Sequence, residues 1–391
     1  MKENRPSVEV DRNYLVDFLT RAIAYPTPIT DEGEQDDQIL GFLEELMATE
    51  LELLGLDLVD FDEMGNVCGR LNGIDRNQPP LLLIGFSMTH PAASMSDAFN
   101  PRLADGSEFG EQGQVVVGRG AGEQKGPLAA VVAALETLNR SGDRPVCDVH
   151  LVCLASGETG RHDAIRSAIE HFRLEPAGAV VAVCTANDIV IGHKGRVDVE
   201  VTIHGRSAHS SSPDLGVNAL EGAAEAMARI RDVGLGDPHP DLGPRTITPV
   251  RLDTLPNAAH TIPSEARLLL DCRLLPGDTP ESMLSRVTDA LAETGPFRVE
   301  VRAGDVMYPS DVPADSWLVE SLANSVLSVT GSSPSLLRIP AATDSGYLNS
   351  HGIPAVLFGP GDITKAHTDQ DYVAVDEAVG AAQSLVHLMR T

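Results

Sequence analysis

The chain has 391 residues, and its 57 acidic against 29 basic side chains give a formal net charge of −28 at neutral pH. This length exceeds the usual size of a single hydrophobic core, so two domains are expected, and 42% hydrophobic residues are enough to fill both cores. Phosphate backbones and anionic lipid surfaces would repel so acidic a protein. The composition therefore argues against nucleic acid and membranes as partners.

Two further features of the sequence bear on its compartment. The segment MKENRPSVEVDRNYL is polar and does not resemble a secretory signal, and no apolar run approaches the roughly 18 residues that a membrane span needs. The five cysteines include no C-x-x-C pair, which is typical of small buried side chains in a reducing compartment. We therefore expect a cytoplasmic protein.

Hydrophobic periodicity predicts alternating helices and strands in the first half of the chain. The polar, irregular segment 91–114 is predicted to be a long surface loop. Alternation of strand and helix is typical of a mostly parallel sheet covered by helices, an α/β fold. Helices are expected over 11–24, 35–55, 128–140 and 163–172, and strands over 66–70, 81–85, 149–154 and 178–183.

The pattern changes after Gly195. We predict that 1–195 and 305–391 form one α/β domain, and that 196–304 form a smaller α+β domain inserted into it. In the inserted part, strands are expected over 197–205, 264–275 and 297–303, and helices over 216–233 and 280–294. A strand within 351–361 and a helix over 376–389 then resume the first pattern.

Candidate site residues follow the predicted buried strands. The segment 86–88 follows LLLIG, Glu158 lies in the turn SGETG, and Cys184 follows AGAVVAV. Glu123 lies in the glycine-rich turn GRGAGEQKGP, and His367 lies in the late segment AHTD. Active sites of open α/β sheets lie beyond the carboxyl ends of the strands, so these residues are expected to converge.

The order of several motifs resembles one known family. The motifs are GRGAGEQKGPLAA, SGETG, IGHKG, GRSAHSSSPDLGVNAL, TIPSEARLLLDCR, GIPAVLFGPG and AHTDQDYV. The same order is found in the aminoacylase, acetylornithine deacetylase, succinyl-diaminopimelate desuccinylase and carboxypeptidase G family of co-catalytic zinc peptidases. The resemblance covers essentially the whole chain. It implies a zinc-peptidase-like catalytic domain and an inserted lid domain through which the chain would form a homodimer.

The resemblance implies that the first zinc position has changed. The family binds two zinc ions that share a carboxylate, and its first motif supplies a histidine ligand oriented by an aspartate. Here Phe86 and Met88 stand at those positions, so both are counted among the substrate-contacting residues instead. Glu123 stands at the bridging carboxylate and Cys184 at a further carboxylate ligand. A zinc ion at this first position is therefore not expected.

The second zinc position resembles the family more closely. The family's adjacent glutamates, a general base followed by a ligand, appear here as Gly157 and Glu158, so the base is missing. A general base contributes roughly a hundredfold to ten-thousandfold to the rate. Glu123, Glu158 and His367 remain as a possible ligand set for one ion of zinc, manganese or cobalt. The expected cofactor is thus none or one divalent metal ion, and a two-zinc centre is not expected.

Positions that the family uses for its substrate are better retained. His209 matches the histidine that reaches the active site across the dimer and stabilises the oxyanion. Arg273 matches the arginine that holds a substrate carboxylate, and His260 stands where the family usually has asparagine. Thr343 and Asp344 fall in the substrate loop, although an arginine often found there is missing. The expected ligand is a small, carboxylate-bearing molecule derived from an amino acid.

Three functions remain open from the sequence. The first is an enzyme that uses this fold for acyl transfer, condensation, cyclisation or elimination, with Glu158 retained at its site. In that enzyme Cys184 would be the nucleophile and His367, His260 or His209 its acid–base partner, the alternative being a buried and inert Cys184. The second function is a single-metal amide hydrolase of N-acyl amino acids or dipeptides. The third is a non-catalytic binding homologue.

Overall fold

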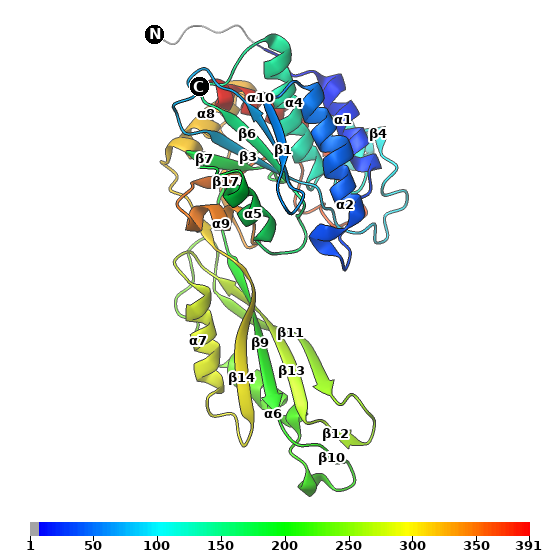
Figure 1. Cartoon of the computed structure of the whole chain (residues 1–391), viewed down its shortest axis with the longest axis vertical. Coiled ribbons are helices and arrows are strands. Elements are labelled where there is room, and N and C mark those ends of the chain that lie inside the picture. Colours follow the sequence, from blue (N-terminus) through cyan, green and yellow to red (C-terminus); the bar gives the residue numbers. More distant parts are fainter. Residues whose placement is uncertain (1–7) are drawn as a thin grey trace. The chain divides into compact units, whose positions relative to one another are not determined.

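The computed structural model describes residues 8–391 and divides into two compact units (Figure 1). Each unit has its own apolar core. Among the described residues, no helix combines the length and the hydrophobicity required to cross a membrane. The larger unit contains Met1–Ile191, Val312–Leu337 and Tyr347–Thr391, and the smaller contains Gly192–Asp311 and Arg338–Gly346.

The larger unit consists of helices packed around a mixed sheet. Its helices are α1 (Arg12–Ala24), η1 (Gly33–Gln35), α2 (Asp37–Gly41), η2 (Phe42–Ala48), α3 (Thr49–Leu53), η3 (Gly106–Phe109), α4 (Lys125–Ser141), α5 (Asp163–His171), α8 (Trp317–Thr330) and α10 (Val375–Arg390). Its strands are β1 (Leu58–Phe61), β2 (Val67–Leu71), β3 (Leu81–Phe86), β4 (Arg102–Asp105), β5 (Gln114–Val117), β6 (Val149–Leu154), β7 (Gly178–Val181), β17 (Ala355–Leu357) and β18 (Tyr372–Ala374). Three elements run across a unit boundary along the chain: β8 (Ile189–His193), β16 (Leu336–Ile339) and α9 (Ser345–Ser350).

The central sheet of the larger unit has the strand order β1-β2-β6-β3-β7-β17-β8. Its middle is parallel, because β3 pairs in parallel with both β6 and β7, and β17 pairs in parallel with β7. Phe86 pairs with Leu154 and Ile84 with Val181, so the carboxyl ends of β3, β6 and β7 lie at one edge. The predicted α/β class with a mostly parallel sheet is confirmed, and the turns that follow these strands lie together.

Helix α4 lies at the centre of this unit. All of its residues from Lys125 to Leu138 are buried, since α4 packs on β3 and is itself covered by α1 and α10. The alanines of LAAVVAAL add little bulk and so allow this close packing. The turn that carries Glu123 leads directly into α4. The end of this turn is therefore held in place by the buried helix.

Lys125, the first residue of α4, is fully buried. Its Nζ donates hydrogen bonds to the carbonyl oxygens of Ala22 at 2.6 Å and Tyr25 at 2.7 Å, and lies 4.6 Å from the centre of the Phe42 ring. These carbonyls end α1 and have no partner within that helix. Burial lowers the pKa of Lys125 to about 7. The lysine therefore ties the start of α4 to the end of α1.

Two sequence predictions differ from the structure of this unit. The segment 91–114 is not a plain surface loop, because β4 pairs with β5, and β5 with β18, in a small antiparallel sheet. The mostly exposed side chains of β4 gave it a polar composition that hid the strand. The helix expected over 35–55 is also not uniform, since Phe42–Ala48 has π-helical hydrogen bonding between α2 and α3.

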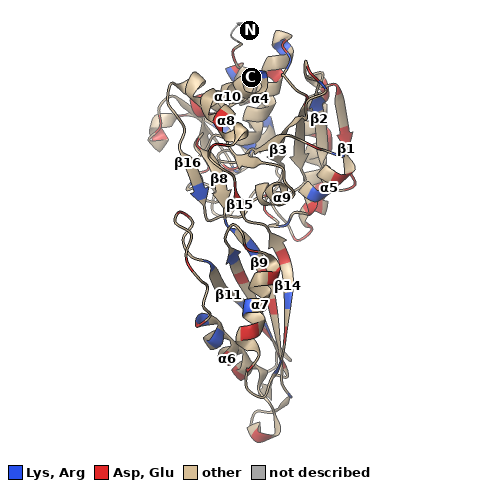
Figure 2. Ribbon diagram, turned by 90° about the vertical axis from the view of Figure 1, so that its left-hand side faces the viewer, with Lys and Arg blue, Asp and Glu red and all other residues tan. Residues whose placement is uncertain are grey.

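The smaller unit is an antiparallel sheet of strand order β11-β13-β9-β14 that packs on two helices. Buried side chains alternate with more exposed ones along β9 and β13, and the buried ones face α6 and α7. Figure 2 shows residues of both charge signs along the strands. The elements are β9 (Gly195–His204), β10 (Ala208–His209), η4 (Pro213–Leu215), α6 (Ala219–Arg231), β11 (Thr246–Leu255), β12 (Thr261–Ile262), β13 (Glu265–Leu274), α7 (Pro280–Leu291), β14 (Arg298–Met307) and β15 (Ser310–Asp311).

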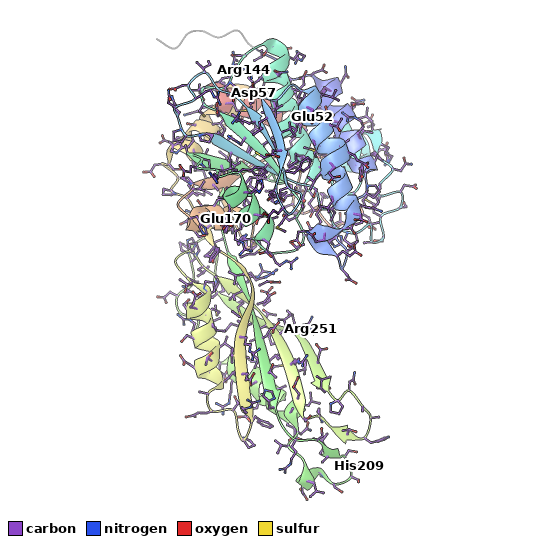
Figure 3. The ribbon with its side chains drawn as sticks, viewed as in Figure 1. Glu52, Asp57, Arg144, Glu170, His209 and Arg251 are labelled. Carbon is purple, nitrogen blue, oxygen red and sulfur yellow. The ribbon has the colours of Figure 1, made fainter. Side chains whose placement is uncertain are left out.

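Strand β11 was not predicted from the sequence. None of its residues is buried, so it lacks the apolar alternation that indicates a half-buried strand. Its register with β13 shifts between Pro249 and Arg251, the latter labelled in Figure 3. A proline at a bulge is tolerated on an edge strand because no ladder hydrogen bond is lost there. Side-chain pattern alone therefore could not identify this strand.

A buried ion pair in the larger unit connects three loops. Arg119 and Asp371 are both fully buried, and Nη1 of Arg119 lies 3.3 Å from Oδ2 of Asp371. The same Nη1 donates to the carbonyl oxygen of Thr368 at 3.0 Å, and Nη2 donates to that of Ala92 at 3.1 Å. Asp371 accepts hydrogen bonds from the backbone N–H groups that precede and follow Ala121. The pair thus joins the turn that carries Glu123 to the loop that carries His367.

We expect Arg119→Leu to lower the free energy of unfolding by about 3–5 kcal/mol, because it leaves the Asp371 carboxylate buried without its counter-charge. Urea denaturation followed by circular dichroism measures the change. The matched control is Arg102→Leu, whose partner Glu108 lies 3.4 Å away with both side chains more than half exposed. That exposed pair is expected to change stability by at most about 1 kcal/mol. Equal effects of the two variants would contradict the role given to Arg119.

Candidate functional site

Three residues with metal-binding side chains converge at the carboxyl edge of the larger unit's sheet. Glu123 lies in the turn before α4, Glu158 between β6 and α5, and His367 between β17 and β18. One ligand atom from each lies within 4.8 Å of the others, which makes this the one such group of three or more among residues 8–391. The convergence expected from the sequence is therefore present for these three residues.

His367 connects the two carboxylates. Its Nε2 contacts Oε1 of Glu123 and lies 3.4 Å from Oε2 of Glu158. Hydrogen bonds to Glu123 and Glu158 raise the pKa of His367 to about 10, because both favour the charged imidazolium. Its φ of 63° is unusual for a residue with a side chain. The ring of His90 stacks on that of His367, with centroids 4.2 Å apart.

Glu123 is nearly buried, with 6% of its surface exposed. Its Oε1 contacts His367, whereas its Oε2 has no hydrogen-bond partner among the described residues. Burial raises the pKa of Glu123, and the nearby Glu158 raises it further, while the hydrogen bond to His367 opposes the shift. A buried carboxylate oxygen without a hydrogen-bond partner is unusual in a folded protein.

The space next to Gly157 is filled by Gln124. A β-carbon at Gly157 would lie 2.4 Å from Oε1 and 2.9 Å from Nε2 of Gln124, and the φ of 151° at Gly157 disfavours any other residue. Nε2 of Gln124 donates a 2.8 Å hydrogen bond to Oε1 of Glu158. A neutral amide therefore lies beside the position at which the resemblance places a glutamate base.

Phe86 and Met88 are buried, with exposed fractions of 4% and 0%. Phe86 ends β3 and Met88 belongs to the main apolar core. The residue between them, Ser87, donates its hydroxyl to the carbonyl oxygen of Leu154. Neither apolar side chain can bind a zinc ion as a carboxylate or an imidazole would. The role of these two residues as substrate contacts stays a prediction.

Cys184 follows β7 and is 5% exposed. Burial raises the pKa of its thiol to about 12, and the negative charge of Glu123 adds to the shift. The thiol is therefore neutral at physiological pH, whereas a nucleophilic cysteine would need to be a thiolate. These properties favour the buried, inert interpretation of Cys184 over the nucleophilic one.

His209 and His260 lie near each other in the smaller unit. His209 is the last residue of β10 and pairs with Thr261 of β12, immediately after His260. The backbone N–H of Ser210 donates to the carbonyl oxygen of His260 at 2.9 Å. Figure 3 shows His209 at the end of this unit where β10 and β12 lie. Both histidines are exposed.

Arg273 lies near the end of β13 in the four-stranded sheet, whereas β12, the partner of His209, leads into the start of β13. It pairs with Arg196 at the start of β9, whereas Glu265 at the start of β13 pairs with His204 at the end of β9. At about 3.3 Å per residue, Arg273 and Glu265 are about 26 Å apart. Arg273 therefore does not meet His209 within one chain. Its guanidinium donates to both oxygens of Asp271, at 2.7 and 3.0 Å.

The remaining substrate-loop candidates also lie in the smaller unit. Thr343 Oγ1 lies 3.0 Å from Nε2 of His193 and 3.0 Å from the hydroxyl of Ser345. Asp344 is 5% exposed. Thr343 therefore lies beside His193, the last residue of β8. No sequence pattern indicated the contacts of Gln124 or the stacking of His90 on His367. The glycine at 157 indicated an empty space without indicating what fills it.

Comparison with known proteins defines the family. Residues 97–391 match the model of peptidase family M20/M25/M40. The chain belongs to this peptidase family. It is 26% identical over 389 residues to an acetylornithine deacetylase of Myxococcus xanthus, covering 97% of this chain and 96% of that protein. It is 24% identical to a succinyl-diaminopimelate desuccinylase of Rhodospirillum centenum, covering 73% of each. The resemblance read from the motifs is confirmed.

Solved structures of the family share the fold. A family M20 metallo-carboxypeptidase of Sulfolobus solfataricus aligns with a TM-score of 0.74 at 20% identity, covering 96% of this chain and 98% of that chain. The aminopeptidase PepT of Bacillus cereus aligns with a TM-score of 0.74 at 17% identity, covering 97% and 98%. Family M20 proteins use divalent metal ions, typically zinc. Glu123, Glu158 and His367 offer the mixed oxygen and nitrogen donors that suit one such ion.

Cys184 is expected to resist alkylation in the native protein. Iodoacetamide at about pH 8 reacts with thiolates, and the raised pKa and burial of Cys184 suppress this form. Cys147, which is only half-buried, should be modified first. Peptide mass spectrometry of native and urea-unfolded protein measures the order of modification. Faster labelling of Cys184 than of Cys147 in the native state would restore it as a candidate nucleophile.

His367 is expected to stabilise the chelator-treated protein at neutral pH. Because its pKa is raised in the folded state, the stabilisation is complete below the unfolded pKa of about 6.5 and is lost as pH rises toward about 10. Urea denaturation of wild type and His367→Gln from about pH 6 to 9.5 measures the difference in unfolding free energy. That difference should shrink as pH rises. A difference that grows over this range would show that the imidazolium does not pair with the two carboxylates.

Proposed function

We propose that this family M20 protein is an enzyme that acts on a small, carboxylate-bearing amino-acid derivative without the two-ion hydrolytic mechanism. The proposed chemistry is acyl transfer, amide condensation, cyclisation or elimination, as in a biosynthetic step. The observation that supports it is the pairing of Gly157 with Gln124: the position of the base carries no side chain, and a neutral amide fills the space. An amide cannot take a proton from water, so activation of water by the family's route is lost.

The first ion position supports the same proposal. Its matching residues include buried, apolar Phe86 and the neutral thiol of Cys184, which leaves Glu123 as the single carboxylate ligand. Divalent zinc is held by three or four nitrogen, sulfur or oxygen donors in proteins, and this set falls short. No catalytic step is therefore assigned to an ion at this position.

A second candidate function is a single-metal amide hydrolase. The clustered ligand atoms of Glu123, Glu158 and His367 favour it, because two carboxylates and an imidazole suit one zinc, manganese or cobalt ion. Such an ion polarises a carbonyl and lowers the pKa of a bound water. Binding of the ion would require His367 to lose its proton. The two candidates thus differ in whether turnover depends on metal.

We also propose a homodimer through the smaller unit. His209 pairs with β12, which leads into the start of β13, whereas Arg273 lies near the other end of β13, so the two side chains cannot contact one small ligand in the same chain. A second copy would be needed to bring a His209 to the ligand that an Arg273 binds. The Arg273 assignment requires the substrate carboxylate to compete with Asp271 for the guanidinium. Location in the cytoplasm stays a prediction.

Metal content and metal dependence test the proposed function. Protein purified without chelator is analysed by elemental mass spectrometry, and mixtures of N-acyl amino acids with free amino acids are assayed by mass spectrometry before and after EDTA. The proposal expects products of transfer or condensation that persist after EDTA. One metal ion per chain, with hydrolysis that EDTA abolishes, would instead establish the single-metal hydrolase.

A reversion experiment separates the missing base from the missing ligands. Gly157→Glu alone would collide with Gln124, so the informative variant combines Gly157→Glu and Gln124→Ala with Phe86→His, Met88→Asp and Cys184→Glu. Recovered zinc binding and N-acyl amino acid hydrolysis would show that these positions account for the lost mechanism. The control keeps Gly157 and Gln124 and changes the other three positions; it should bind zinc without comparable hydrolysis.

A further inference from the structure

A cavity of about 310 Å³ lies in the larger unit, at the edge of the central sheet opposite to Glu158. It is lined by residues at the amino ends of the parallel strands, where Leu81 of β3 pairs with Gly178 of β7, together with residues of α8 and α10. Glu158 follows the carboxyl end of β6, and the length of that six-residue strand separates the two places by about 17 Å. The cavity is therefore separate from the candidate metal site.

The lining of this cavity carries no charge on its side chains. Among residues 8–391, no aspartate, glutamate, lysine, arginine or histidine lines it, although the chain as a whole has a formal net charge of −28. Its backbone groups are paired with one another: the N–H of Val146 donates to the carbonyl oxygen of Met389 at 2.8 Å, and that of Ala177 to Pro80 at 2.9 Å. Burying a charge in such a lining is costly, so a neutral ligand is favoured.

Trp317 supplies an aromatic surface to the cavity. It is the first residue of α8 and the sole tryptophan in the sequence, and it is 46% exposed. Its ring lies against Gly178, where a β-carbon would come within 2.9 Å of its Cζ2, so the glycine makes room for the ring. A tryptophan ring held in this way offers a face on which another ring can stack.

Two sulfur-containing side chains complete the lining. Cys147 is half-buried and precedes β6, and Met389 is buried near the end of α10. Sulfur atoms of cysteine and methionine are polarisable, and sulfur makes favourable contacts with aromatic rings. An indole ring, two sulfur atoms and the lack of charge therefore favour the same kind of ligand, a neutral aromatic ring.

We propose that this cavity binds a neutral aromatic molecule of one or two rings, which stacks on Trp317 and contacts the sulfur atoms of Cys147 and Met389. Its volume lies at the lower end of the range of about 300–1,000 Å³ that is usual for small-molecule sites. Binding here uses neither a metal ion nor any of the candidate catalytic residues. The inference therefore goes beyond the proposed function and does not depend on it.

The fluorescence of Trp317 measures binding directly, because no other tryptophan contributes to the emission. The probes are benzyl alcohol and cyclohexylmethanol, which differ in whether the ring is aromatic, and benzoate and benzylammonium, which add a negative or a positive charge. Benzyl alcohol should give a saturable change and bind at least about threefold more tightly than cyclohexylmethanol. Both charged probes should bind at least about tenfold more weakly than benzyl alcohol, because their charge would be buried.

Two variants locate the binding to this cavity. Ala177→Leu adds bulk to its lining and should weaken the binding of benzyl alcohol at least about tenfold. The control is Ala292→Leu, the same substitution at an exposed residue that follows α7 in the smaller unit, and it should leave binding unchanged. Trp317→Leu, measured by calorimetry, should remove the preference for benzyl alcohol over cyclohexylmethanol.

A measurement on the unaltered protein keeps the test independent of how the variants fold. Saturating benzyl alcohol should slow the alkylation of Cys147 by iodoacetamide, because the bound ring covers the thiol, whereas the alkylation of free cysteine in the same buffer should not change. An emission change that never saturates, together with unprotected Cys147, would overturn the proposal. Binding that survives in a folded Ala177→Leu would place the ligand elsewhere and overturn it too. Equal affinity for the charged probes or for cyclohexylmethanol would overturn the proposed ligand class.

Discussion

The buried ion pair between Arg119 and Asp371 is the constraint on which the site depends. Three loops that are far apart in sequence meet at these two side chains, because Arg119 also binds the carbonyl oxygens of Thr368 and Ala92. Breaking such a pair leaves a charge in a medium of low polarity, which is much more costly than breaking an exposed pair. The positions of Glu123 and His367 are therefore fixed by Arg119 and Asp371, which are not themselves candidate metal ligands. Desolvation still raises the pKa of Asp371 to about 6, even though Arg119 and two backbone N–H groups favour its charged form.

A rigid support of this kind explains how the site tolerates unsatisfied acceptors. Lys125 fixes the start of α4 to the end of α1, and Asp371 holds the turn before it, so Glu123 and Gln124 lie between two anchored points. In a flexible turn these side chains would rotate toward water and pair there. Held in place, they keep unpaired oxygens in a poorly hydrated position.

Sequence patterns predicted the parts of this protein that follow simple periodicities. The buried runs of β3, β6 and β7 identified the parallel centre of the sheet. Position after β6 identified Glu158, and the resemblance to the family added Glu123 and His367. Strands β4 and β11 were not predicted from the sequence because their exposed side chains lack apolar alternation. The contact between Gln124 and Gly157 was not predicted either. Gly157 lies 33 positions further along the chain, and no local pattern indicates that the two residues meet.

In the proposed function, the glycine at position 157, where the resemblance places a glutamate base, changes which reactions the site can favour. A glutamate base takes up a proton as water attacks, whereas the Gln124 amide keeps its protons and can only orient a donor. The groups that remain able to exchange protons are His367 and the two carboxylates, and their mutual hydrogen bonds hold the imidazole in its charged form. A charged imidazole donates a proton and does not accept one. In the proposed enzyme, this imidazolium would protonate or polarise a bound group.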